Sequence, residues 1–531
     1  MNGRGVRRTL SALVLAAATG AAVLVSGTEA LAAPVPLTSV VPAPVTATPT
    51  AGVTYTIGSA TAIYTEPGSA AATGIGDYLA GILRPSTGFP LPVAAAPSGS
   101  PSGIALLLTG APASVGAQGY QLDVTATAIT VRANQPAGLF AGVQTLRQLL
   151  PPAVEAATVQ TGPWQVGGAH VVDYPRFAYR GAMLDVARHF FAPAAVRRYL
   201  DQLALYKVNY LHLHLSDDQG WRIAISSWPN LAGYGGATAV GGDPGGYYTQ
   251  ADYTALVAYA ASRYITIVPE IDMPGHTNAA LASYAQLNCD GVAPARYTGT
   301  AVGFSSLCVP LELTYTFIDQ VVGELAALTP GPYLHIGGDE ASSTTAADYT
   351  TFIDRVQQIV AAHGKTVLGW HDVVHAGPQP SRIAQFWGTG TSDAAVAGAA
   401  ANGTKVIMSP ASRTYLDMKY KSSTRLGQKW AGLIDVDKAY DWNPGAYLSG
   451  VGESSVLGVE APLWTETIRT TADLDYMAFP RLPAIAELGW SPYSTHNLSA
   501  FKGRLGAQGP RWRVMGIGYY HSTQVTWPAG S

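Results

Sequence analysis

The chain has 531 residues and a formal net charge of −3 at pH 7, and only 12% of its residues are charged. This length is enough for two or three domains with large cores. No long run of Lys or Arg follows the first eight residues, so nucleic acid and anionic membranes are not expected as partners.

The amino terminus resembles an export signal. A basic start from Arg4 to Arg8 precedes an apolar run, Leu10–Leu24, and the small-x-small tripeptide Ala30-Leu31-Ala32. The run is short and rich in Ala and Gly, which makes it a poor membrane span. We therefore expect secretion, with residues 1–32 removed by cleavage near Ala32. A twin-arginine signal at Arg7-Arg8 is the alternative.

Residues 33–52 are rich in Pro, Thr, Val and Ala and are expected to form a linker. Residues 53–171 contain alternating apolar runs such as Tyr120–Val124, which predict strands. Helical patterns cover Gly76–Leu83 and Gly138–Leu150. The region is predicted to be a small α+β domain, a sheet with helices on one side.

From residue 172 to 515 the pattern changes to strand followed by helix, repeated along the chain. The expected strands are Arg180–Leu184, Val208–Leu215, Ile265–Glu270, Tyr333–Ile336, Thr366–Trp370, Ile383–Trp387, Lys405–Met408 and Val456–Trp464. Eight such units predict a (β/α)8 TIM barrel of the α/β class, with an open doubly wound sheet as the alternative. Residues 516–531 would form a C-terminal tail.

Only two cysteines are present, Cys289 and Cys308. In an exported chain, two cysteines 19 positions apart suggest one disulfide that closes a loop. Two free buried thiols are the alternative, and a zinc site on two cysteines is less favoured still.

Chemistry is expected at the carboxyl ends of the strands, the face of a parallel barrel that carries active sites. The strand Tyr333–Ile336 ends in Gly337-Gly338-Asp339-Glu340, where glycines let a ligand approach the backbone next to two carboxylates. An acidic helix N-terminus is the alternative for this pair. Aromatic and charged residues follow the other strands, as a carbohydrate site requires. They include Asp185, Asp217, Asp218, Glu270, Asp272, His276, Trp370, Asp372, Trp387, Tyr415, Asp417, Trp430, Trp464 and Glu466.

Six segments together resemble the substrate-assisted β-N-acetylhexosaminidases of glycoside hydrolase family 20, with a likeness to secreted bacterial members. The resemblance spans about residues 53–515. The segments are Gly138-Leu139-Phe140-Ala141-Gly142-Val143-Gln144-Thr145-Leu146, Arg180-Gly181-Ala182-Met183-Leu184-Asp185, His212-Leu213-His214-Leu215-Ser216-Asp217-Asp218-Gln219-Gly220-Trp221-Arg222, Pro269-Glu270-Ile271-Asp272-Met273-Pro274-Gly275-His276, His335-Ile336-Gly337-Gly338-Asp339-Glu340 and Trp464-Thr465-Glu466.

The resemblance implies a role for each residue of the site. Glu340 would be the general acid, Asp339 would accept the acetamido N–H of the substrate, and Tyr415 would donate to the acetamido oxygen. Asp217 and His276 would orient Glu340 from behind. The substrate-binding residues implied are Arg180, Asp417 and Glu466 on the ring hydroxyls, Trp370, Trp387 and Trp464 around the acetamido pocket, and Trp430 on the aglycone side.

The implied substrate is a terminal, non-reducing β-linked GlcNAc or GalNAc on chitooligosaccharides or glycans, and no cofactor is expected. Two other interpretations remain open. One is a metal-dependent barrel hydrolase, in which His212 and His214 act with Asp272, His276 and Asp339. The other is a sugar-binding barrel without catalysis. The oligomeric state is not predicted.

Overall fold

The structure is a computed structural model, which describes residues 1, 33–99, 102–379 and 381–530. The expected export signal lies outside these residues, apart from its first. No helix in the described part of the chain has both the length and the apolar character to cross a bilayer.

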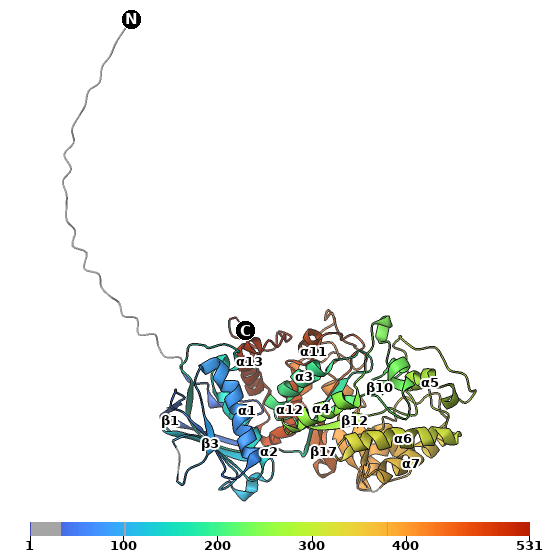
Figure 1. Cartoon of the computed structure of the whole chain (residues 1–531), viewed down its shortest axis with the longest axis horizontal. Coiled ribbons are helices and arrows are strands. Elements are labelled where there is room, and N and C mark those ends of the chain that lie inside the picture. The colour runs from blue at the N-terminus through green and yellow to red at the C-terminus, as the bar shows by residue number, and fades with distance from the viewer. Residues whose placement is uncertain (2–32, 100–101, 380, 531) are drawn as a thin grey trace, which may run out of the picture. The chain divides into compact units, whose positions relative to one another are not determined.

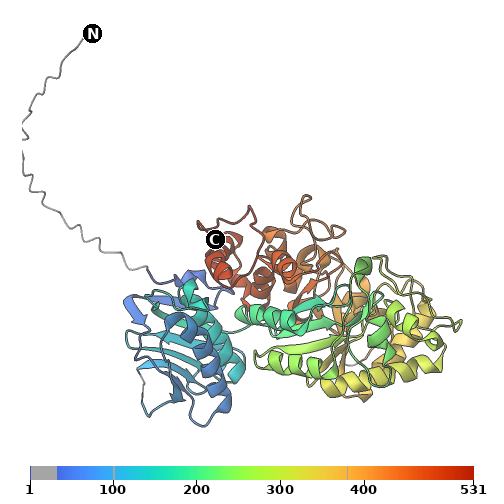
Figure 2. The ribbon, with the colours of Figure 1, turned by 45° about the horizontal axis from the view of Figure 1, so that its top comes forward.

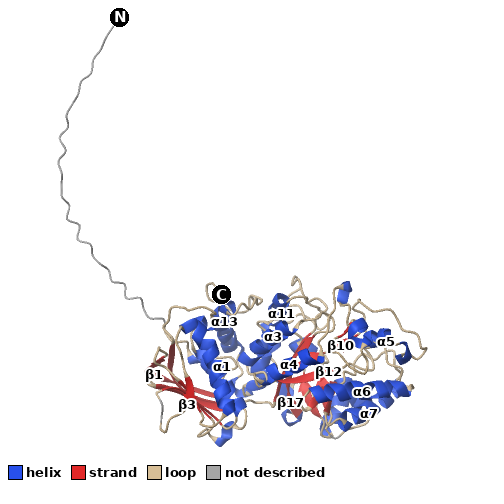
Figure 3. Cartoon of the chain, viewed as in Figure 1, coloured by secondary structure: helices blue, strands red, loops and turns tan. Residues whose placement is uncertain are grey.

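The first domain is built on a seven-stranded sheet with the order β1-β7-β5-β6-β4-β2-β3. Its elements are β1 (Thr46–Thr56), β2 (Ile63–Thr65), α1 (Ala70–Thr87), β3 (Val93–Ala95), β4 (Gly103–Leu107), β5 (Tyr120–Val124), β6 (Ala128–Ala133), α2 (Pro136–Leu149) and β7 (Gln165–Asp173). The helices α1 and α2 pack against each other and against the sheet (Figure 3). Every residue of α2 from Gly138 to Leu149 is buried, because the helix has packed neighbours on all sides.

The expected linker over residues 33–52 is wrong for its second half. Residues 46–52 belong to β1, which pairs antiparallel with β7 from Thr46 opposite Val172. Val40 and Val41 are fully buried. The sequence pattern did not reveal this strand because β1 lies at the edge of the sheet and its first half is exposed, so no apolar alternation is required.

The second domain is a closed barrel of eight parallel strands, as the sequence predicts. The strands are β8 (Tyr179–Asp185), β9 (Tyr210–His214), β12 (Thr266–Glu270), β13 (Tyr333–His335), β14 (Thr366–Trp370), β15 (Ile383–Phe386), β16 (Lys405–Met408) and β17 (Val456–Leu463). A short hairpin, β10 (Ser216–Asp217) and β11 (Gly220–Trp221), follows β9. Pairing of β17 with β8 closes the ring.

Helices surround the barrel strands, and α6 and α7 run side by side along its outside (Figure 1). They are α3 (Pro193–Leu205), α4 (Gln250–Ala261), α5 (Asn278–Ser283), α6 (Glu312–Leu328), α7 (Ala346–Ala362), α8 (Ala394–Ala401), α9 (Ala411–Thr414), α10 (Val436–Tyr440), α11 (Thr471–Ala478), α12 (Leu482–Trp490) and α13 (Leu498–Val514). The last helix, α13, returns to the first domain (Figure 2), where Arg511 forms an ion pair with Glu155.

The first domain covers the amino ends of the barrel strands. Lys207, between α3 and β9, is buried and donates to Asp173 of β7 at 2.9 Å and to the Tyr120 hydroxyl at 3.0 Å. Arg180, at the start of β8, donates to Gln118 of the first domain at 2.7 Å. The carboxyl ends of the strands are therefore the face that is left for a site.

The expected disulfide joins Cys289 and Cys308, whose Cα atoms lie 5.0 Å apart. We expect Cys289→Ser to lower the free energy of unfolding by about 3 kcal/mol, because the unfolded chain loses its cross-link. Denaturant unfolding of the variant and of the wild type, with and without dithiothreitol, measures this. A reductant should destabilise the wild type and leave the variant unchanged. An unchanged unfolding midpoint in the variant would contradict the prediction.

Candidate active site

The turn after β13 places Asp339 and Glu340, and only glycine fits its first two positions. Gly337 has φ +67°, and a Cβ there would lie 1.7 Å from an oxygen of Asp272. Gly338 has φ +101°. Glu340 itself has φ +47°, a conformation that is unfavourable for a residue with a side chain. The backbone strain at Glu340 indicates that the position of its carboxyl is held by the surrounding structure.

His276 connects the two carboxyls to the barrel interior. Its Nε2 atom lies 3.3 Å from Oε2 of Glu340 and 3.8 Å from Oδ2 of Asp339. Its Nδ1 atom lies 3.2 Å from Oδ1 of Asp217, on the β10 strand. Burial opposes protonation of His276, but the Asp217 carboxylate outweighs it, and the pKa of His276 stays well above its usual value. His276 is therefore a cation next to both acids.

A cavity of about 540 Å³ opens beside this group. It brings together nine of the residues that the sequence predicts for the site. These are His276, Asp339, Glu340, Trp387, Tyr415, Asp417, Trp430, Trp464 and Glu466. Arg188, Thr300, Val302 and Gln428 complete the lining. Thr300 and Val302 lie on the loop that the disulfide closes.

The two neighbouring acids differ in burial. The Asp339 side chain is 11% exposed, whereas that of Glu340 is 36% exposed. Burial raises the pKa of Asp339 to about 7; His276 opposes this shift and Glu340 adds to it. Burial, and then the charge of Asp339, raise the pKa of Tyr415 well above its usual value, so its hydroxyl remains a hydrogen-bond donor.

The prediction that Arg180 binds ring hydroxyls is wrong. Arg180 begins β8, at the opposite end of the barrel, where it donates to the carbonyls of Lys207 and Phe177 at 2.9 and 2.8 Å. The arginine of the cavity is Arg188, which follows the carboxyl end of β8. Its Nη2 atom lies 2.7 Å from Oδ2 of Asp217, and its guanidinium lies over the Trp464 ring at 4.8 Å. The sequence did offer a signal for this difference. Arg180 stands at the start of its strand and Arg188 after the end, and the two ends of a barrel strand lie on opposite faces of the barrel.

Trp370 also differs from its expected place. It is fully buried and does not line the cavity, although it had been expected as one of its walls. Its ring lies 5.7 Å from that of Trp464, and its Nε1–H donates to Glu270 at 3.0 Å. Trp370 therefore supports Trp464 from behind. Trp387 does line the cavity, and its Nε1–H donates to Asp372 at 3.0 Å.

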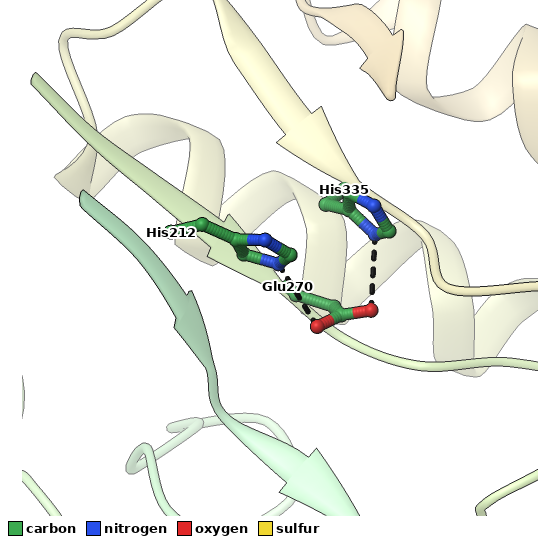
Figure 4. A group of neighbouring side chains, drawn as sticks. All are labelled: His212, Glu270 and His335. Carbon is green, nitrogen blue, oxygen red and sulfur yellow. Dashed lines mark hydrogen bonds and ion pairs between the residues drawn. The ribbon is translucent and has the colours of Figure 1, made fainter. Parts of the chain in front are cut away.

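The sequence left open a metal site that includes the barrel histidines His212 and His214. Among the described residues, the ligand atoms of His212, Glu270 and His335 lie close enough to share an ion, as do those of His276, Asp339 and Glu340. Figure 4 shows, however, that His212 and His335 each point a ring nitrogen at one oxygen of Glu270, at 2.9 and 3.0 Å. The other nitrogen of His212 lies 2.9 Å from Glu460. The two contacts of His212 have the lengths of hydrogen bonds, whereas Nδ1 of His335 accepts the backbone N–H of Gly337 at 3.0 Å.

We expect Arg180, at the start of β8, and Arg188, after its carboxyl end, to differ in function. Arg188→Lys should lower kcat/KM for a chromogenic N-acetylglucosaminide, the substrate implied by the resemblance, by about 10- to 100-fold, because lysine cannot reproduce the planar fork. Arg180→Lys should lower the unfolding midpoint and leave kcat/KM within about threefold of the wild type. Equal losses of activity in the two variants would contradict the conclusion that Arg180 lies outside the substrate site.

Comparison with known proteins identifies the family of both domains. Residues 177–493 match the catalytic domain of glycosyl hydrolase family 20, and residues 37–174 match its domain 2. A β-N-acetylhexosaminidase of Cellulomonas fimi is 40% identical over 455 residues, which cover 86% of this chain and 90% of that protein. An N,N'-diacetylchitobiase of Vibrio harveyi is 29% identical over 491 residues, which cover 70% of this chain and 54% of that protein.

Solved structures agree with the sequence matches. The family 20 β-N-acetylhexosaminidase of Streptomyces coelicolor A3(2) is 58% identical with a TM-score of 0.91, and the match covers 94% of this chain and all of that one. A mutant β-hexosaminidase of Streptomyces plicatus, in complex with its product GlcNAc, has the same identity and TM-score over 94% of this chain and 99% of that one. The chain therefore belongs to glycosyl hydrolase family 20 and is a hydrolase of the β-hexosaminidase type.

Proposed function

We propose that the protein is an exo-acting β-N-acetylhexosaminidase that releases terminal, non-reducing β-linked GlcNAc or GalNAc by substrate-assisted, retaining hydrolysis. Chitooligosaccharides and glycans are the proposed substrates. The names of the relatives and the GlcNAc complex of the Streptomyces plicatus enzyme support the sugar.

One observation carries the mechanism: Asp339 and Glu340 lie on the same wall of the cavity and share one partner, His276. A double displacement on two enzyme carboxyls needs them on opposite sides of the scissile bond, about 5–5.5 Å apart. Neighbours on one turn fit that requirement poorly. Family 20 enzymes are a recognised exception, in which the 2-acetamido group of the substrate supplies the nucleophile.

In the first step Glu340 would transfer its proton to the glycosidic oxygen while the acetamido oxygen attacks the anomeric carbon. The bond to the leaving group breaks, its electron pair stays on the departing oxygen, and an oxazolinium ion forms on the sugar. In the second step the Glu340 carboxylate would take a proton from water as the water oxygen attacks the anomeric carbon. The amide is restored, and two inversions at that carbon give net retention.

Asp339 and Tyr415 are the groups that would control the acetamido group. Positive charge develops on the amide nitrogen as the ring closes, and a carboxylate at Asp339 would accept its N–H and stabilise that charge. The Tyr415 hydroxyl, held neutral by burial, would donate to the acetamido oxygen and aim it at the anomeric carbon. Both line the cavity together with Glu340.

The remaining lining residues would bind the sugar ring. Burial raises the pKa of Asp417, to which the charge of Glu466 adds, and burial also raises the pKa of Glu466. The two carboxyls would form hydrogen bonds with the ring hydroxyls. Among the described residues, Nη1 of Arg188 has no hydrogen-bond partner and lies 3.6 Å from Oδ2 of Asp185, so it would donate to a substrate hydroxyl. Trp464 would lie against the apolar face of the sugar, and Trp430, which is 54% exposed, would border the leaving group.

We also propose that the chain is exported, with cleavage near Ala32, and that it degrades chitin fragments outside the cell. The basic and apolar pattern of residues 1–32 supports export. The similarity to a chitobiase supports the substrate.

Glu340→Gln tests the general acid. We expect kcat/KM for aryl N-acetylglucosaminides with poor leaving groups to fall by about 10²- to 10⁴-fold, because these need a proton on the departing oxygen. Substrates with good leaving groups need little protonation and should lose much less. Steady-state kinetics on a series of substituted phenols measures the difference. Equal losses across the series would remove Glu340 from this role.

Asp339→Asn tests the assisted mechanism. Wild-type rates should fall as fluorine is added to the N-acetyl group, because the acyl oxygen becomes a weaker nucleophile, and Asp339→Asn should be slow throughout the series. Because the pKa of Asp339 is raised to about 7, its carboxylate is lost below that pH. The wild-type kcat/KM should therefore rise with pH through an acid limb that ends near 7, and this limb should be absent in Asp339→Asn. Normal turnover of a 2-acetamido substrate by the variant would refute the mechanism.

A further inference from the structure

A row of alternating carboxylates and imidazoles runs through the barrel interior to the site. Each histidine of the row lies between two acids. His212 and His214 are two positions apart on β9, so both side chains point into the barrel, where both contact Glu270. In spatial order the row is Glu460, His212, Glu270, His214, Asp217, His276 and Glu340. Its members up to Asp217 have no exposed side-chain surface.

Glu270, the last residue of β12, is the point where the row branches. Its Oε2 atom lies 2.9 Å from Nε2 of His212 and 2.5 Å from Nδ1 of His214. Its Oε1 atom lies 3.0 Å from Nδ1 of His335 (Figure 4) and accepts the Nε1–H of Trp370 at 3.0 Å. Four ring nitrogens from three strands, β9, β13 and β14, surround these two oxygens. A carboxylate offers an acceptor to all three of the donors His212, His214 and Trp370, whereas the amide of glutamine would turn an NH₂ group toward at least one of them. Nδ1 of His335 instead accepts the backbone N–H of Gly337 at 3.0 Å.

The charges of the row alternate in the same way as its residues. Burial opposes protonation of His212, but Glu460 and Glu270 outweigh it and raise the pKa of His212 to about 9. Burial also opposes protonation of His214, and Glu270 outweighs it, so its pKa lies well above the usual value. Burial favours a neutral Glu270, yet His214 and its neighbours hold the pKa of that carboxyl well below its usual range. These shifts favour cationic His212 and His214 on either side of an anionic Glu270.

Two arms lead from Glu270 to the site. On one arm His214 contacts Asp217 at 2.8 Å, and Asp217 in turn contacts His276, the partner of Glu340. On the other arm the Trp370 indole, fixed through its Nε1–H, lies behind Trp464 of the cavity lining, at 5.7 Å between ring centres. The buried carboxylate of Glu270 therefore contacts one residue of each arm. His214 leads to Glu340, and Trp370 lies behind Trp464, the sugar platform on which the ring would lie.

We propose that Glu270 is a positioning residue for the hydrolysis: through His214 and Asp217 it keeps His276 charged and directed at Glu340, and through Trp370 it supports the sugar platform of Trp464. The inference rests on the proposed role of Glu340 as general acid. The competing interpretation is a buried ion cluster that only stabilises the barrel. That interpretation predicts the same loss of stability and no link to proton transfer.

The test compares Glu270→Gln with Glu460→Gln, a matched change to an equally buried carboxylate two contacts further along the row. Glu270→Gln should lower kcat for aryl glycosides with poor leaving groups by about 10- to 100-fold and for good leaving groups by only a few-fold, with little change in KM. Glu460→Gln should keep the wild-type dependence on the leaving group, even if its unfolding midpoint falls. The same leaving-group dependence in both variants would overturn the proposal.

A double-mutant cycle with His276→Asn separates positioning from bulk stability. If Glu270 acts through His276, adding Glu270→Gln to His276→Asn should change the leaving-group dependence by less than about threefold. Independent, multiplicative effects would overturn the first arm of the proposal. If Glu340→Gln itself shows no leaving-group dependence, the proposed function fails instead, so the two failures are distinguishable.

A measurement on the wild type remains decisive if Glu270→Gln does not fold. Isotope-labelled histidine side chains should give nuclear magnetic resonance signals of three rings, His212, His214 and His276, that are protonated on both nitrogens at pH 7. Single substitutions of each histidine assign the signals. Neutral rings for His214 and His276 at pH 7 would overturn the proposal.

Discussion

The contact between His276 and Asp217 is the interaction on which the rest of the site depends. It joins the two acids of the cavity to a fully buried carboxylate, which Arg188 and His214 also contact. An isolated buried charge is costly, and removing one partner of such a group costs several kcal/mol because the other charge is left uncompensated. The cation next to Glu340 is therefore maintained by the barrel interior and not by solvent.

Local backbone strain is placed at the same point. His276 has φ +57° and Glu340 has φ +47°, and each such residue costs about 1–3 kcal/mol. Gly337 in the same turn has no alternative, because a side chain there would collide with Asp272. The packed turn leaves Glu340 few alternative positions, which suits its proposed role of giving up and regaining one proton at a fixed place.

The two ends of the barrel have different tasks. The amino end is closed by the first domain, where the buried pairs of Lys207 with Asp173 and of Arg511 with Glu155 hold the two domains together. The carboxyl end stays open and carries the cavity, as in other parallel barrels. Arg180 and Arg188 lie on opposite sides of this division, although only eight positions separate them in the sequence. One fixes the domain contact and the other faces the substrate cavity.

The sequence by itself determined the repeating strand and helix pattern, the disulfide pair, and the Gly337-Gly338-Asp339-Glu340 turn with most of its aromatic neighbours. Such features are local, because periodicity and glycine content act within a few residues. Tertiary structure decided that residues 46–52 form part of the edge strand β1, that Arg188 and not Arg180 lines the cavity, and which residues contact Glu270. A hydrogen-bonded edge needs no apolar pattern, and which end of a strand meets a cavity depends on barrel closure. A buried carboxylate finds its four ring nitrogens only when β9, β13 and β14 come together around it.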